Sequence, residues 1–309
     1  MRTGHPAELV MGSAQLGLAY GAANRTGKPV RETALALIRR AADAGIGAFD
    51  TARTYGDAEE RLGDALLGRR SRAITKLSSL SELAPDAPPE AVREAVDASI
   101  AQSRHALRRE RLDCLLLHRA HHMTAYDGAI WQRLLEHRES GAIAALGVSV
   151  QSPQEAHRSL AEPSVSHIQL PFNLLDWRWR EAGIIAALRT RPDVTVHARS
   201  AFLQGVLAAE DARVWPSIPG ISPPDLIAWL AETARAFRRS SVADLALAYV
   251  RGQDWIDGVV VGQETEAQLD ANLGLAARPP LSPEDCGRID MSAPRVPERL
   301  LDPAQWKPQ

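Results

Sequence analysis

The sequence is poor in cysteine, poor in lysine and free of long apolar runs. Its 309 residues include two cysteines, which are too few for a disulfide framework. Cys114 lies inside the apolar run 112–117, so we expect a buried thiol there. Residues 1–6 contain no apolar signal core, and no stretch approaches the roughly 18 apolar residues that span a bilayer. These absences predict a cytoplasmic protein with no membrane partner.

Positive charge comes almost entirely from arginine. Lysine and arginine together number 36 against 38 aspartates and glutamates, which gives a formal net charge of −2. The only lysines are Lys28, Lys76 and Lys307, and no basic cluster recurs with interleaved aromatic residues. Because a nucleic-acid surface needs concentrated positive charge, we expect no nucleic-acid partner. With 45% hydrophobic and 24% charged residues, the composition is that of an ordinary globular protein.

Short apolar runs alternate with longer amphipathic stretches, which is the pattern of repeated strand and helix units around a parallel sheet. Most of the runs are apolar throughout, as strands buried on both faces should be. Eight such units in about 260 residues favour a closed (β/α)8 TIM barrel of the α/β class. We expect one domain over residues 1–309, with residues 279–309 as a tail that packs on the barrel. The expected strands lie near residues 8–13, 46–50, 73–77, 112–118, 144–149, 166–171, 194–198 and 257–261.

The helices between these strands are recognised by apolar residues at helical spacing. The stretch 31–44 is the clearest, and it ends at Gly45, a C-terminal stop signal. The alternative architecture is an open, doubly wound sheet. However, the glycines of residues 12–21 do not match the dinucleotide-binding pattern G-x-G-x-x-G, and we expect no helix to begin there. The other expected helices include 89–108, 130–140, 177–189, 224–238 and 242–250.

Polar residues that end apolar strands are the candidates for chemistry, because active sites of these barrels lie at the carboxyl ends of the strands. Asp50 ends the second expected strand and Tyr55 follows it, Lys76 lies in the third strand, and His118 ends the fourth. Taken alone, each could be a helix cap, a turn residue or a satisfied core group. Lys76 is different, because an unpaired ammonium that points into a barrel is costly to bury. Asp50 is its natural counter-ion.

These four residues suit the protonation of a carbonyl oxygen while hydride arrives at the carbonyl carbon. A tyrosine gives up its proton near neutral pH only when an adjacent ammonium favours the phenolate. We therefore assign proton donation to Tyr55 and the supporting charge to Lys76. Asp50 would keep Lys76 protonated, and His118 would align the carbonyl through a hydrogen bond. The hydride must come from a nicotinamide, because no side chain can donate one.

The segments that contain these residues resemble those of the aldo-keto reductase superfamily. The resemblance runs in the right order over nearly the whole chain, through residues 49–52, 55–56, 59–63, 75–76, 116–118, 146–149, 169–176, 200–207, 260–262 and 272. It implies a barrel fold, an NAD(P)H cofactor and a small-molecule carbonyl substrate. It also implies a catalytic tetrad, which consists here of Asp50, Tyr55, Lys76 and His118.

The resemblance further implies where the cofactor would lie. Ser149 and Gln169 would bond the nicotinamide carboxamide, and Arg199 would occupy the place where many relatives stack an aromatic ring. A guanidinium plane can also stack. Tyr20, in the first loop, would line the substrate pocket or pack in the core. The other implied cofactor residues follow the pyrophosphate or surround the adenosine end, and they are Gly12, Ser13, Ser200, Phe202, Gln204, Gly205, Gly262, Gln263, Glu264, Gln268 and Asn272.

Two departures from the family pattern affect the cofactor. Many relatives have asparagine after the serine of the fifth strand, whereas this chain has Val150, which removes one possible carboxamide partner. Relatives that are specific for NADPH usually place a cation near residues 262–264 and 268. Here Glu264 could instead accept a ribose hydroxyl and repel a 2′-phosphate. The sequence therefore favours NADH.

The leading hypothesis is NAD(P)H-dependent reduction of an aldehyde or ketone, sugar-like compounds included, with alcohol oxidation as the reverse reaction. The alternative is a regulatory protein that senses NAD(P)H on the same barrel and acts through a protein partner. A phosphate-handling barrel enzyme is disfavoured, because no glycine-rich phosphate loop follows the seventh strand. No metal is expected, because His121 and His122 are adjacent and no further ligand has a matching spacing.

Overall fold

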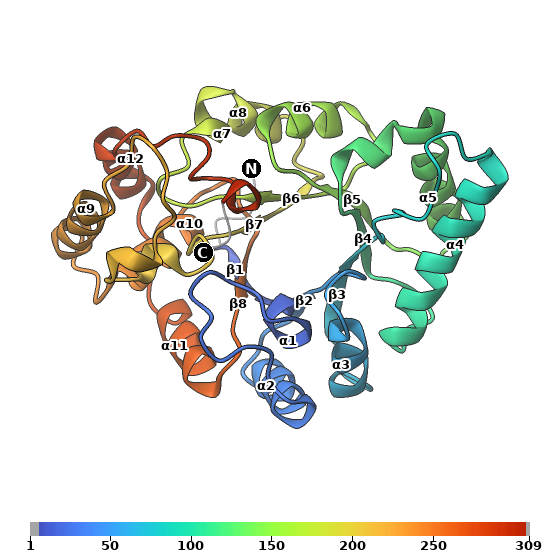
Figure 1. Ribbon diagram of the computed structural model, residues 1–309, viewed down its shortest axis with the longest axis horizontal. Coiled ribbons are helices and arrows are strands. Elements are labelled where there is room, and N and C mark those ends of the chain that lie inside the picture. Colours follow the sequence, from blue (N-terminus) through green and yellow to red (C-terminus); the bar gives the residue numbers. More distant parts are fainter. Residues whose placement is uncertain (1–5, 307–309) are drawn as a thin grey trace.

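Eight parallel strands form a closed barrel in the computed structural model, which describes residues 6–306 (Figure 1). Each strand pairs with the next one in the sequence, and β8 returns to pair with β1. The predicted fold class is confirmed, and each expected strand is present. The strands are β1 Glu8–Gly12, β2 Ala48–Asp50, β3 Arg72–Lys76, β4 Cys114–Leu117, β5 Leu146–Ser149, β6 His167–Pro171, β7 Thr195–Arg199 and β8 Gly258–Gly262.

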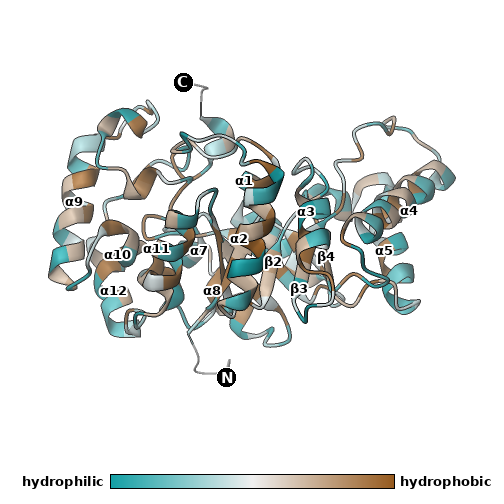
Figure 2. Ribbon diagram, turned by 90° about the horizontal axis from the view of Figure 1, so that it is seen from below, coloured by the Kyte–Doolittle hydropathy of each residue, from teal (hydrophilic) through white to brown (hydrophobic). Residues whose placement is uncertain are grey.

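The helices surround the strands (Figure 1), and their polar and apolar residues lie on different sides, as α2 and α9 show in Figure 2. Their inward sides enclose an apolar shell that contains most of the buried side chains. The helices are α1 Ala14–Gly17, α2 Arg31–Asp43, α3 Ala58–Ala65, α4 Pro89–Ala106, α5 Ala129–Glu139, α6 Pro153–Ala161, α7 Arg178–Glu181, α8 Ile184–Arg189, α9 Pro223–Ala236, α10 Val242–Arg251, α11 Glu266–Ala276 and α12 Pro283–Ser292. Short 3-10 turns include η1 Ala120–Met123, η3 Val206–Ala208 and η5 Pro303–Gln305.

Two expectations about the elements are wrong in detail. The helix expected over 177–189 is interrupted at Gly183, whose φ of 73° ends α7 before α8 begins. A one-turn helix, α1, does begin directly after the first strand. Within the expected tail 279–309, residues 283–292 form α12, which has Ser282 as its N-cap.

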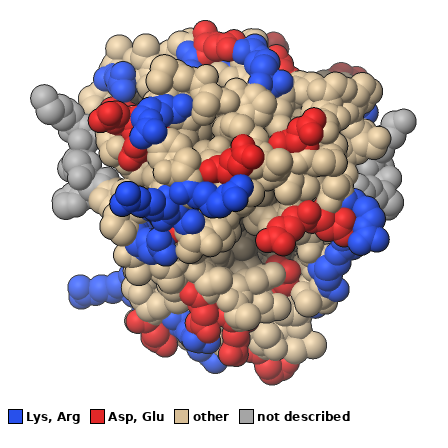
Figure 3. Space-filling model, turned by 90° about the vertical axis from the view of Figure 1, so that its left-hand side faces the viewer, with Lys and Arg blue, Asp and Glu red and all other residues tan. Residues whose placement is uncertain are grey.

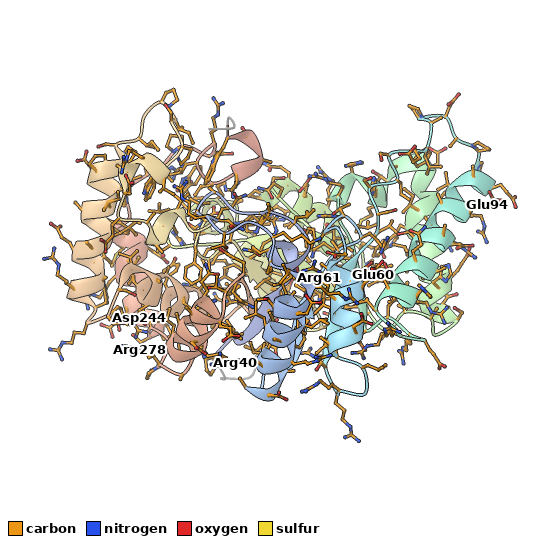
Figure 4. All side chains as sticks on the ribbon, turned by 60° about the horizontal axis from the view of Figure 1, so that its bottom comes forward. Arg40, Glu60, Arg61, Glu94, Asp244 and Arg278 are labelled. Carbon is orange, nitrogen blue, oxygen red and sulfur yellow. The ribbon has the colours of Figure 1, made fainter. Side chains whose placement is uncertain are left out.

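Closure of the barrel is matched by closure of the helix ring. β1 and β8 are paired over their whole length, with Val10 opposite Val260. On the outside, Arg40 of α2, labelled in Figure 4, bonds Glu266 and Asp270 of α11, so the first and last βα units are joined. These surface ion pairs contribute little individually. The strand ladder therefore provides most of the closure.

Charged groups of both signs are interspersed on the outer surface. Figure 3 shows this for one face, where acidic and basic side chains alternate. In the first turn of α10, the buried carboxylate of Asp244 bonds Arg239 and Arg278, and Figure 4 labels Asp244 and Arg278. Within residues 6–306, no helix combines the length and apolarity that a membrane span requires. Both thiols, Cys114 and Cys286, are free and buried, as expected for Cys114.

Two histidines share the barrel interior with apolar side chains. The rings of His167 and His197 lie 4.3 Å apart, edge to face, and the His197 ring fills the space over Gly258. Among residues 6–306, neither nitrogen of His197 has a hydrogen-bond partner, although Glu8 Oε1 lies 3.8 Å from its Nε2. Burial, with the charges of Arg72 and Lys76, lowers the pKa of His197 to about 3. Burial also holds the pKa of His167 well below its ordinary value.

These two histidines should make the fold sensitive to acid. The unfolded chain binds a proton near the ordinary histidine pKa of about 6.5, whereas folded His197 binds one only near pH 3. Stability should therefore fall as the pH falls from 6.5 towards 3, by about 1.4 kcal/mol per pH unit for His197, and the lowered pKa of His167 acts in the same direction. Urea unfolding of wild type and His197→Gln between pH 7 and pH 5 tests this prediction. The pH dependence of the free energy of unfolding gives the number of protons that the chain takes up on unfolding. Near pH 5 this number should be about one smaller in the variant, and an equal number in both proteins would contradict the prediction.

Candidate active site

A cavity of about 770 Å³ opens at the carboxyl ends of the strands. The loops that follow β1, β4 and β7 form its walls, and the C-terminal residues 302–304 close one side. The structure brings most of the sequence-predicted residues together on its lining. These are Gly12, Ser13, Tyr20, Asp50, Tyr55, His118, Ser149, Gln169, Arg199, Ser200, Phe202, Gln204, Gly205, Gly262, Glu264, Gln268 and Asn272.

A buried ion pair lies at the base of this cavity. Lys76 Nζ donates to Asp50 Oδ1 at 2.8 Å, to Asp50 Oδ2 at 2.7 Å and to the carbonyl of Thr51 at 2.9 Å. Gln169 donates to the same carboxylate at 2.7 Å. Burial would lower the pKa of Lys76, but the attraction of Asp50 outweighs it and raises that pKa. Lys76 is therefore a permanent cation beneath the cavity.

Tyr55 and His118 stand above this cation. Lys76 Nζ lies 5.2 Å from the centre of the Tyr55 ring. The rings of Tyr55 and His118 are 5.9 Å apart and nearly perpendicular, with an interplanar angle of 86°. Burial, followed by the charges of Lys76, Arg119 and Arg199, lowers the pKa of His118 to about 3. The imidazole is therefore neutral near pH 7, and its Nδ1 lies 3.2 Å from Thr54 Oγ1.

Two glycines set the position of Tyr55. The Tyr55 amide donates to the Ala52 carbonyl at 3.0 Å, in the turn that leaves β2. Gly56 follows with a φ of 57°, a conformation that favours glycine. A side chain at Gly17 would collide with the Tyr55 carbonyl, and one at Gly56 would collide with the Gly17 carbonyl. The first loop therefore packs directly on the turn that holds the tyrosine.

Several polar atoms on the cavity floor have no partner of their own. Among the described residues, neither Ser13 Oγ nor Gln169 Oε1 has a hydrogen-bond partner, although both side chains are fully buried. Orphaned buried polar atoms are costly, so they indicate a ligand with matching donors and acceptors. Ser149, 7% exposed, lies on the adjacent strand β5. This group fits the carboxamide of a nicotinamide.

The loop after β7 folds back over the mouth of the cavity. Ser200, Leu203, Gln204 and Gly205 all have positive φ, between 47° and 88°. The Gln204 carbonyl accepts from the Ala23 amide at 3.3 Å, so this loop meets the first loop. Gln204 also donates to the Tyr20 hydroxyl at 3.3 Å. Tyr20 is therefore a wall residue that is 43% exposed.

Gln263 departs from its predicted place, because it does not line the cavity. Its side chain is buried on the other side of the segment and accepts from Asn272 at 3.3 Å. Neighbouring residues of an extended segment point in opposite directions, so Gly262 and Glu264 face the cavity instead. Glu264 accepts from the Gln268 side chain at 2.9 Å, and Gln268 accepts from the Glu264 amide at 2.8 Å.

Sequence reasoning missed a polar chain on the opposite wall. Arg199 Nη2 donates to Gln151 Oε1 at 2.6 Å, and Gln151 Nε2 donates to Asp302 Oδ1 at 3.0 Å. The Gln151 amide donates to Glu155 Oε2 at 2.6 Å. The capping box formed by Ser152 and Glu155 predicts the start of a helix from the sequence, but it does not predict that the preceding residue lines a cavity.

The buried ion pair should dominate the cost of removing Lys76. Lys76→Met leaves the Asp50 carboxylate buried with Gln169 as its remaining side-chain donor, so the free energy of unfolding should fall by about 3–5 kcal/mol. Lys28→Met is the matched control, because Lys28 pairs with Asp57 at 2.8 Å on the surface. That change should cost at most about 1 kcal/mol. Urea unfolding at pH 7 measures both, and similar small losses would contradict this assignment.

Comparison with known proteins agrees with this geometry. The family model described as the aldo/keto reductase family matches residues 8–293. The D-threo-aldose 1-dehydrogenase of a Pseudomonas species is 28% identical, over 90% of this chain and 94% of the relative. The L-glyceraldehyde 3-phosphate reductase of Escherichia coli O157:H7 is 26% identical, over 84% of this chain and 83% of the relative.

Solved structures show the same fold. The aldo-keto reductase AKR11C1 from Bacillus halodurans, in its holo form, superposes with a TM-score of 0.75 at 23% identity, over 94% of this chain and 93% of that one. The glycerol dehydrogenase AKR11B4 from Gluconobacter oxydans gives a TM-score of 0.72 at 21% identity, over 94% of each chain. The family match over nearly the whole chain decides the assignment. The chain belongs to the aldo/keto reductase family of oxidoreductases.

Proposed function

We propose that the protein reduces an aldehyde or ketone to an alcohol with a nicotinamide cofactor, and that Tyr55 donates the proton. The observation that supports this proposal most strongly is the position of Lys76 beneath Tyr55. The Lys76 ammonium, held by Asp50 at 2.7 Å, lies 5.2 Å from the Tyr55 ring at the base of an open cavity. A fixed cation beneath a phenol is the arrangement that stabilises the phenolate left after proton transfer.

Each of the four side chains, Asp50, Tyr55, Lys76 and His118, has a separate role in carbonyl reduction. The substrate oxygen lies between the Tyr55 hydroxyl and the neutral His118 imidazole, which holds the carbonyl by donating a hydrogen bond. As hydride reaches the carbonyl carbon, the Tyr55 O–H bond breaks and its proton passes to the oxygen, which becomes the alcohol hydroxyl. Lys76 stabilises the resulting phenolate, and Asp50 keeps Lys76 charged and in place. Tyr55 then regains a proton from solvent.

A nicotinamide, when bound, supplies the hydride. Ser13, Ser149 and Gln169 would hold its carboxamide, in agreement with the unpartnered oxygens of Ser13 and Gln169. The loop 200–205 would follow the pyrophosphate with its backbone amides. Glu264, Gln268 and Asn272 would surround the adenosine end.

We infer a preference for NADH over NADPH. At the end of the cavity formed by β8 and α11, the described lining residues include Glu264 and no lysine or arginine. A ribose hydroxyl can donate to this carboxylate, whereas a 2′-phosphate meets repulsion and no cation.

The substrate is expected to carry hydroxyl groups. The cavity wall presents Tyr20, Arg119, Gln151 and Asp302, which can donate to and accept from several hydroxyls. Two similar proteins are named for an aldose and a phosphorylated glyceraldehyde. We therefore propose a sugar-like carbonyl compound, bound within one domain whose C-terminal tail completes the pocket.

Tyr55→Phe tests the proton donor. The change should lower kcat/KM for carbonyl reduction by about 10²–10⁴-fold, because general acid catalysis is lost. The dissociation constant for NADH should stay within twofold. Tyr126→Phe is the matched control, because the Tyr126 hydroxyl donates to the Ala84 carbonyl outside the cavity. Retained turnover in Tyr55→Phe, or nucleotide binding without turnover of any aldehyde or ketone in wild type, would overturn the proposal.

Fluorescence titration with NADH and NADPH tests the cofactor preference. Wild type should bind NADH at least about tenfold more tightly, and Glu264→Gln should reduce this ratio by removing the repelling charge. Glu266→Gln is the control, because Glu266 pairs with Arg40 outside the cavity. Equal affinities in wild type, or an unchanged ratio in Glu264→Gln, would contradict the role of Glu264.

A further inference from the structure

Arg199 places a positive charge in the cavity in addition to those of Arg119 on the lining and Lys76 beneath it. It is the last residue of β7, and its guanidinium donates to Gln151 Oε1 at 2.6 Å and to the Val150 carbonyl at 3.3 Å. Gln151 is itself held by Asp302 and Glu155. The guanidinium is therefore fixed from the side of β5.

This charge is not neutralised by a close carboxylate. Within residues 6–306, no carboxylate forms an ion pair with Arg199 at 4.0 Å or less. The acids Asp302 and Glu155 are reached only through Gln151. Lys76, by contrast, is compensated by Asp50. Arg199 thus leaves an uncompensated positive charge. This charge contributes to the lowered pKa of His118, although burial and the charges of Lys76 and Arg119 contribute more.

Any hydride donor must lie close to this guanidinium. The donor carbon has to touch the carbonyl carbon that Tyr55 and His118 position. Its carboxamide has to reach the unpartnered oxygen of Gln169 on β6. β6 is hydrogen-bonded to β7, with Pro171 opposite Arg199. The ring and the guanidinium therefore share the same end of these two strands.

The two redox forms of the ring respond differently to such a neighbour. Oxidised nicotinamide carries one positive charge, and the reduced ring is neutral and electron-rich. A guanidinium attracts an electron-rich ring and repels a cation, and partial burial strengthens both effects. An aromatic residue at this position would have the opposite preference.

We propose that Arg199 makes the site bind reduced nicotinamide more tightly than oxidised nicotinamide. The bound oxidised form is then a stronger oxidant than the free one, and the site is poised for alcohol oxidation. The balanced reaction is NAD⁺ + R₂CHOH → NADH + R₂C=O + H⁺. The hydride moves from the alcohol carbon to the ring, and the hydroxyl proton passes to Tyr55 phenolate and then to solvent. This inference rests on the proposed function and concerns the equilibrium between the bound redox forms, whereas the net direction in solution follows the concentrations of substrate and cofactor.

Equilibrium binding tests the inference without turnover. The dissociation constant of NADH is measured by fluorescence titration of the full chain, and that of NAD⁺ by displacement of bound NADH. Wild type should bind NADH at least about tenfold more tightly than NAD⁺, and Arg199→Gln should reduce this ratio by about tenfold. For a two-electron couple, a tenfold change in the ratio shifts the bound potential by about 30 mV.

Three further variants complete the experiment. Arg199→Lys keeps the charge and should keep most of the ratio. Arg213→Gln removes an exposed cation that does not line the cavity and should change the ratio by less than twofold, because solvent screens that charge. Gln151→Leu removes the group that holds Arg199 and should lower the ratio in part, which keeps the inference testable if Arg199→Gln does not fold.

The outcomes separate the inference from the proposed function. If both nucleotides bind and the ratio is the same in wild type, Arg199→Gln and Gln151→Leu, the inference is wrong and the reductase proposal stands. If Arg213→Gln changes the ratio as much as Arg199→Gln, the effect comes from the net charge of the protein rather than from Arg199, and the inference is also wrong. If neither nucleotide binds wild type, the proposed function itself fails.

Discussion

The site depends on one costly interaction, the burial of the Lys76 ammonium beside the Asp50 carboxylate. An ammonium that is 1% exposed is tolerated only when its hydrogen bonds are complete. β2 supplies the carboxylate, the following turn supplies the Thr51 carbonyl, and β6 supplies Gln169, so the pair is satisfied only when the barrel is closed. Fold and chemistry are thus coupled, because the same closure fixes the cation beneath Tyr55.

The loops around this ion pair are placed by close backbone contacts. Gly17 and Gly56 let the first loop lie directly on the turn of Tyr55. Gly205 likewise approaches Ala23, where a side chain would lie 2.6 Å from the Ala23 Cβ. The C-terminal segment is tied in by Asp302 through Gln151. Each loop is therefore held by another loop, which builds a cavity wall from segments distant in the chain.

Much of the fold and the centre of the site could be predicted from the sequence. Apolar runs marked all eight strands, and polar residues at strand ends, such as Lys76 and His118, lie where parallel strands must bring them together. The break at Gly183 and the turn of α1 were missed, because a single glycine or a four-residue helix gives a weak periodic signal. The contact between Gln151 and Asp302 spans 151 residues, and no local pattern encodes it.

A double-mutant cycle on kcat/KM tests most directly whether Lys76 and Tyr55 act as one unit. Wild type, Tyr55→Phe, Lys76→Met and the double variant are compared with one aldehyde and saturating NADH, after folding of each has been verified. The main catalytic contribution of the cation in this account is to the phenolate, because burial is the largest cause of the low pKa of His118. The double variant should therefore lose about as much kcat/KM as the more damaging single change. Losses that multiply would show that the two residues act independently, and the account of the ion pair as support for the proton donor would be wrong.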